Sequence, residues 1–159
     1  MKQKKIQKKK IALRREIIVN IIVVTMMTAG VAGLTYVLNR PSAEIIRNSV
    51  SFLWGCFMVV FLWYQSKLHH NLEYDNALHP LRFCVVFLLS YILSMGMVFA
   101  PVSSWVFLAI MVVLAMFSNT VIGLTAGTIL LLITTSLSTA GTMHIFFLYF
   151  MTGLIGSWG

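Results

Sequence analysis

The segment Pro101-Val-Ser-Ser-Trp-Val-Phe-Leu-Ala-Ile-Met-Val-Val-Leu-Ala-Met-Phe-Ser-Asn-Thr-Val-Ile-Gly-Leu-Thr-Ala-Gly127 decides the fold of this chain. After its proline, its apolar residues are interrupted only by Ser, Thr, Gly and Asn, and it lies within Phe83–Gly159, where Asp, Glu, Lys and Arg are absent. A soluble domain of this length needs charges on its wet face, whereas small and hydroxylated residues fit between packed helices in a membrane. The sequence therefore predicts an all-α fold, a polytopic membrane helical bundle.

The composition of the whole chain agrees with this class. Of its 159 residues, 59% are hydrophobic and 10% are charged, whereas ordinary soluble domains carry roughly 25% charged residues. The net charge of +8 is concentrated at one end, because eight of the twelve Lys and Arg lie in Met1–Arg15 and none follows Arg82. This distribution indicates membrane topology and anionic lipid as partners, and it argues against nucleic acid.

We divide the chain into a basic cytoplasmic tail, residues 1–16, and a helical membrane domain, residues 17–159. The positive-inside rule places the tail in the cytoplasm of a multi-pass cell-membrane protein, and an even number of spans returns the C-terminus to the same side. The side chains expected to set orientation and contact anionic lipid are those of Lys4, Lys5, Lys8, Lys9, Lys10, Arg14 and Arg15.

Six apolar runs are expected to form about six transmembrane helices. The first run has 22 residues and reaches about 33 Å as a helix, enough to cross a hydrocarbon core of about 30 Å. Asn39–Asn48 is expected to be a loop, in which Ser42, between Pro41 and Glu44, could cap a short interfacial helix. Ser118-Asn119-Thr120 should divide Val102–Leu137 into a helical hairpin. The expected spans are 17–38, 49–65, 81–100, 102–117, 120–137 and 143–158.

Side chains suited to chemistry are sparse. The polar loop before Pro80 could in principle hold a metal, but its spacing matches no known site and a solvated loop is favoured; its candidate ligands are His69, His70, Glu73, Asp75 and His79. His144 is expected to be wet at a helix end. No Asp, Glu, Lys or Arg follows Arg82 in the membrane runs, and no third group orients a Ser–His pair. We therefore predict no enzyme, no cofactor, no metal and no catalytic residue.

Gly123 and Gly127 form a GxxxG motif in the fifth run, and such a motif permits close helix approach. We expect both glycines to face a neighbouring helix, most directly the fourth, and Leu131 to face lipid. The same run is rich in Thr and Ser. These hydroxyls either line a polar interior or ligand pocket, or bond to the carbonyl one turn back.

Pro101 opening a hairpin, Ser118-Asn119-Thr120 followed by Gly123 and Gly127, and Phe146-Phe-Leu-Tyr-Phe-Met-Thr-Gly-Leu-Ile-Gly156 together suggest a family. This region, about Ala100–Gly159, resembles the membrane part of bacterial seven-transmembrane HD-domain receptors, which hydrolyse cyclic di-AMP. The resemblance implies a non-catalytic sensor or anchor module of an HD-type signalling receptor. The chain departs from that family in its short first loop and in the absence of the HD domain.

Two other classes remain open. A substrate-binding membrane subunit of a vitamin-type importer has six spans and a similar length, and the hydroxyl-rich fifth run favours it. A small membrane scaffold of the cell-shape machinery also has five or six spans. Other membrane subunits are accordingly further candidate partners beside the lipid bilayer.

Overall fold

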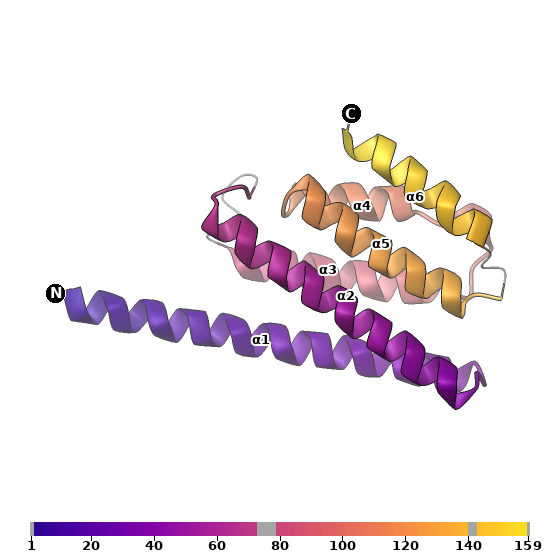
Figure 1. Ribbon diagram of the computed structural model, residues 1–159, viewed down its shortest axis with the longest axis horizontal. Helices are drawn as coiled ribbons and strands as arrows, with labels where there is room; N and C mark the ends of the chain where they lie inside the picture. Colours follow the sequence, from indigo (N-terminus) through magenta and orange to yellow (C-terminus); the bar gives the residue numbers. More distant parts are fainter. Residues whose placement is uncertain (1, 73–78, 140–142, 159) are drawn as a thin grey trace.

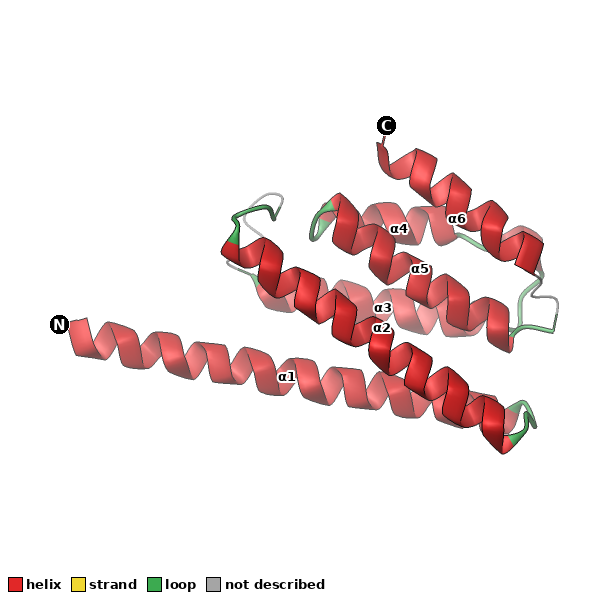
Figure 2. Ribbon diagram, in the orientation of Figure 1, coloured by secondary structure: helices red, strands yellow, loops and turns green. Residues whose placement is uncertain are grey.

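The computed structural model describes residues 2–72, 79–139 and 143–158, and within them every regular element is a helix (Figures 1 and 2). The all-α class is thereby confirmed. The helices are α1 (Lys2–Val37), α2 (Ser42–Leu68), α3 (Pro80–Met97), the 3-10 turn η2 (Val102–Ser104), α4 (Phe107–Met116), α5 (Thr120–Leu137) and α6 (Met143–Trp158).

Three of these helices are long and apolar enough to cross a membrane, which makes the chain a membrane bundle. They are α2, α5 and the Arg14–Val37 part of α1. The apolar stretches of the remaining helices are shorter: Leu81–Met97 in α3, Val102–Met116 in η2 and α4, and Met143–Gly156 in α6. With ten residues, α4 reaches only about 15 Å, half of a hydrocarbon core of about 30 Å. Six complete crossings therefore remain a prediction.

The first helix is continuous across the expected domain boundary at residue 16. It has 36 residues and a length of about 54 Å, and its N-terminal part extends beyond the other helices (Figure 1). It packs against α2 and α3. The hydroxyl of Tyr91 on α3 donates to the Met27 carbonyl at 2.8 Å, directly over Gly30, where a β-carbon would collide with it.

The second helix begins at Ser42, so the expected loop at Asn39–Asn48 and the expected start at residue 49 are wrong. Only Leu38, Asn39, Arg40 and Pro41 separate α1 from α2. Asn39 makes the reversal because its φ of 52° is in the left-handed region, which Asn tolerates after a helix end. Pro41 then stands at the N-cap with φ of −54°, a value that its ring fixes and that suits a helix start.

The connection between α3 and α4 also differs from expectation. The third helix ends at Met97, not at residue 100, and the expected span 102–117 is shortened to η2 and α4. The Trp105 indole N–H donates to the Met97 carbonyl at 3.0 Å, which satisfies one of the carbonyls that a helix end leaves free. Tyr149 on α6 donates to the Val102 carbonyl at 2.8 Å. These bonds hold the chain in a compact turn where a longer helix was expected.

The fifth helix has the expected bounds and is the central element, because it packs against α2, α3, α4 and α6. Gly123 lies against the backbone of Ala115, and Gly127 lies against Met111, so both glycines face α4. Leu131 is fully buried, and the expectation that it faces lipid is wrong. The reason is helical periodicity, since residues four apart lie on one face and Leu131 follows Gly127 by four.

The tight α4–α5 contact makes glycine substitutions position-dependent. We expect Gly123→Ala to destabilise the fold by about 1–3 kcal/mol, because the new methyl meets the Ala115 backbone, which cannot rotate away. Gly127→Ala should cost less because it meets the flexible Met111 side chain. Gly33→Ala is the matched control, since nothing lies within 4 Å of its β-carbon position. Thermal unfolding of the purified protein in detergent ranks the stability of the three variants. Equal losses of stability for Gly123→Ala and Gly33→Ala would contradict the expected ranking.

Candidate functional site

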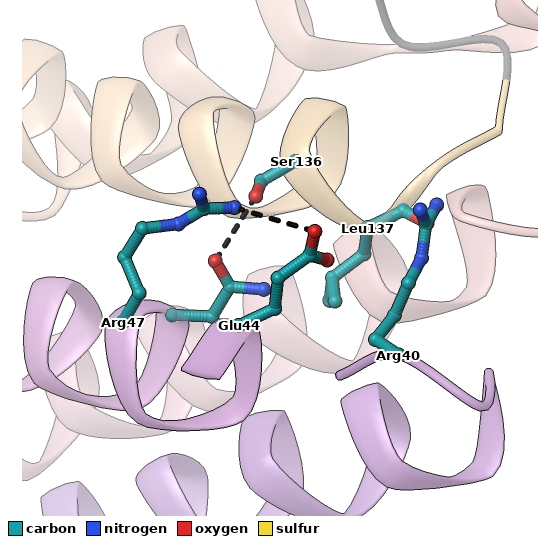
Figure 3. A network of polar contacts seen from close by, with 6 residues as sticks. Arg40, Glu44, Arg47, Ser136 and Leu137 are labelled. Carbon is teal, nitrogen blue, oxygen red and sulfur yellow. Dashed lines mark hydrogen bonds and ion pairs between the residues drawn. The ribbon is translucent and has the colours of Figure 1, made fainter. Parts of the chain in front are cut away.

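Polar side chains gather where the start of α2 meets the C-terminal end of α5 (Figure 3). The Arg40 guanidinium donates to the Leu137 carbonyl at 3.4 Å. A helix C-terminus carries free carbonyls and partial negative charge, so a cation there is favourable. The Ser136 hydroxyl donates to the Asn48 amide oxygen at 3.0 Å. We call this group the Arg40 cluster: Arg40, Glu44, Arg47, Asn48, Ser136 and Leu137.

Asn48 is the buried member of the Arg40 cluster. It is only 3% exposed, and its amide nitrogen has no hydrogen-bond partner among the described residues. The next residue, Ser49, also has a buried hydroxyl without a partner. A buried donor without an acceptor costs roughly 1–3 kcal/mol. Such a donor is a position that a bound group or a rearranged neighbour can stabilise.

The exposed members of the Arg40 cluster are charged. Arg47 lies 4.0 Å from the Glu44 carboxylate, and its side chain is 64% exposed. An exposed pair at this distance contributes little stability, so the Arg47 guanidinium is available to an anion. The cluster therefore suits recognition of an acidic group. The hydroxyl of Ser136, the one hydroxyl among its residues, donates to the Asn48 amide, so no basic side chain activates it as a nucleophile (Figure 3).

A second polar group, the Asn119 cluster, lies at the opposite end of α5. Asn119 caps that helix, because its side-chain oxygen accepts from the Ile122 N–H at 2.9 Å. Its amide nitrogen donates to the Ser66 hydroxyl at 3.0 Å and to the Asn71 carbonyl at 3.2 Å. Asn119 thereby ties the α4–α5 hairpin to the end of α2.

An ion pair joins α2 to α1 near the same end. The Lys67 ammonium lies 2.9 and 3.1 Å from the two carboxylate oxygens of Glu16. The carboxylate is 12% exposed and the lysine side chain 30% exposed. Because it is partly shielded from water, this pair fixes the register of the two helices more firmly than a surface pair would.

The basic residues predicted to contact lipid all lie on α1. Arg14 and Arg15 are exposed. Lys4, Lys5, Lys8, Lys9 and Lys10 are in the helix, and their side chains fall outside the described ones.

The candidate ligands of the polar loop are only partly described. His69, His70 and His79 are exposed, and Glu73 and Asp75 fall outside the described residues. Across the described ranges no three His, Cys, Asp or Glu lie close enough to hold a metal. His144 is exposed on the first turn of α6.

The hydroxyls of α5 mostly bond within their own helix. Thr125, Thr128 and Thr135 donate to the carbonyls four residues back at 2.7–3.0 Å. Thr134 does the same and also lies 3.2 Å from the Ser94 carbonyl of α3. Of the two sequence interpretations, the described contacts match packing, in which each hydroxyl bonds one turn back.

Sequence reasoning missed Arg40 and Asn48 as functional candidates. One signal was present, since Arg40 and Arg47 stand in the loop where the positive-inside rule expects few cations. Their partners on α5 are 97 and 88 residues away from Arg40 and Asn48 respectively, and no local pattern encodes such pairings.

Comparisons of the chain with family models, with curated proteins and with solved structures find no match. The resemblance of Ala100–Gly159 to HD-domain receptors therefore remains a prediction. The residues that carry it have structural roles: Pro101 precedes η2, Asn119 caps α5, and Gly153 lies against Met111.

The dual role of Asn119 can be separated by substitution. Asn119→Ala removes the cap and both bonds to the α2 end, so we expect a loss of about 1–3 kcal/mol. Asn119→Asp keeps the capping oxygen and loses only the donor, so it should be milder. Thermal unfolding in detergent ranks the two variants. A cap-only role would instead leave Asn119→Asp indistinguishable from the parent and Ser66→Ala without effect.

Proposed function

We propose that this chain is a non-catalytic integral membrane module in which α2 connects a sensing end to an anchoring end. The supporting observation is the placement of polar contacts on one helix. The second helix has 27 residues and is about 40 Å long. Near its start it carries Asn48 of the Arg40 cluster, and near its end Lys67 pairs with Glu16 on α1.

In this proposal the basic tail anchors α1 at the cytoplasmic face of the cell membrane. The Arg40 cluster then lies on the extracytoplasmic side, because α1 carries the chain across and α2 returns it. An acidic ligand or partner segment at Arg47 and Asn48 would stabilise one position of α2. The opposite end of α2 would report that position to α1 through the Lys67–Glu16 pair.

The resemblance of Ala100–Gly159 extends the proposal to an HD-type signalling receptor. The module would supply the sensor and anchor, and a phosphohydrolase domain elsewhere in the receptor would supply the output. Two observations decide between this and the other classes. An HD domain encoded beyond Gly159 supports the receptor, whereas a vitamin-type molecule retained at one per purified chain supports the importer subunit.

The connection through α2 is tested by distance measurement between spin labels. Cys56 and Cys84 are replaced by Ala, and labels are placed at Ile11→Cys on the tail and Leu68→Cys at the end of α2. Asn48→Leu removes the buried donor and the acceptor for Ser136 while keeping a branched side chain, so we expect the distance distribution to shift or broaden. Lys67→Gln should abolish that response.

The control for the spin-label experiment is Val50→Leu, on the same helix with an exposed side chain. It should leave the distance unchanged. An Asn48→Leu variant that folds normally and shows the parent distribution would overturn the proposed connection, whatever output domain the protein has.

The proposed orientation makes its own prediction. Reporter fusions after Arg40 and after His70 should fall on opposite sides of the membrane, with the second in the cytoplasm. Replacing Lys8, Lys9, Lys10, Arg14 and Arg15 by Gln should produce a mixed or inverted orientation, because these cations keep the tail on the cytoplasmic side. Matched replacement of Arg40 and Arg47 should leave orientation intact. Same-side reporters in the parent would refute the arrangement.

A further inference from the structure

A cleft of about 370 Å³ lies between α1 and α2. Its walls come from the Ile17–Thr25 part of α1 and the Leu53–Tyr64 part of α2, and they are almost entirely apolar. It is open along one side, and lining side chains from both helices, such as Ile21 and Phe57, are exposed. In a membrane, this side of α1 faces lipid.

The cleft cannot remain empty in a bilayer. A void deprives its lining atoms of dispersion contacts, and water gains too few hydrogen bonds in so apolar a space. The adjacent material is the hydrocarbon chain of a lipid, which is flexible and apolar. An acyl chain is therefore the occupant whose chemistry matches the walls.

The end of the cleft toward the basic tail is polar. Asn20 lines the cleft and also lines a hollow of about 160 Å³ between α1 and α3, whose other walls include Arg15 and Glu16. Arg15 is exposed beside this hollow, and the Lys67 ammonium is paired with Glu16. Two cations, Arg15 and Lys67, thus lie near one carboxylate next to the polar end of the apolar cleft.

We infer that the α1–α2 cleft binds one acyl chain of an anionic phospholipid from the surrounding bilayer, with the phosphate held at Arg15 and Lys67. The excess of cations favours an anionic headgroup over a zwitterionic one. Glu16 competes with the phosphate for Lys67 and so limits the affinity. This is a discrete site for one lipid, distinct from the diffuse attraction of the basic tail.

The test uses the full chain in nanodiscs of phosphatidylcholine and phosphatidylglycerol at three to one. After extraction into mild detergent, native mass spectrometry counts each lipid retained per chain. We expect one phosphatidylglycerol on the parent. Thr25→Trp fills the cleft and should remove it. Ala29→Trp, one turn further along α1 and not among the residues lining the cleft, is the matched control and should retain it.

The headgroup site is tested by two substitutions that each remove one charge, Lys67→Gln and Glu16→Gln. Lys67→Gln should lower phosphatidylglycerol retention about fivefold, the effect of one cation near an anionic lipid. Glu16→Gln should raise retention, because it frees the Lys67 ammonium. If both variants lower retention equally, the ion pair only holds the helices together and the proposed headgroup site is wrong. Equal retention of the two lipids, or equal retention by Thr25→Trp and Ala29→Trp, would overturn the acyl-chain site.

Discussion

Backbone contact between α4 and α5 at Gly123 is the constraint on which the rest of the bundle depends. Without a side chain at this position, α5 approaches the Ala115 backbone directly. The resulting hairpin is thin enough for α2, α3 and α6 to pack around α5 together. Close approach recurs at Gly55, where Ile129 of α5 fills the space of a missing β-carbon on α2. In a membrane, where burial of apolar surface drives little association, such contacts supply much of the packing energy.

Sequence patterns predicted the parts of the fold that local chemistry encodes. Asn119 is a strong helix-capping residue after an apolar run, so the start of α5 followed from its side chain. The length of α2 was underestimated, because Ser42 after Pro41 suggested only a short interfacial helix, whereas α2 runs unbroken from Ser42 to Leu68 with Pro41 at its N-cap. The shortness of α4 was missed because Val102–Val106 is as apolar as a helix, whereas the structure has the turn η2 and an extended Trp105 there, with the Trp105 indole bonded to the Met97 carbonyl.

The candidate site was less predictable than the fold. The basic tail and the glycine pair were visible because charge runs and GxxxG spacing are patterns within one segment. The Arg40 cluster joins α2 to the C-terminal end of α5, and its decisive feature is a buried amide nitrogen that has no acceptor within the described part of the chain. Burial at one position depends on which helices pack together, and a single sequence does not specify that packing. The α5 threonines are the opposite case, a visible sequence pattern without a matching site. Their abundance suggested a polar pocket, but their hydroxyls are bonded within the helix.

The ten-residue length of α4 has a consequence for the membrane itself. Leu108, Val113 and Met116 are exposed along this helix, so lipid meets a hydrophobic wall of about 15 Å on this side and a much taller one along α1 and α2. A helix of this length matches a hydrocarbon core of about 30 Å only where the bilayer thins locally or where flanking segments such as η2 complete the apolar surface. The length of α4 therefore makes this side of the bundle the one where the fit to lipid differs most from that along α1 and α2.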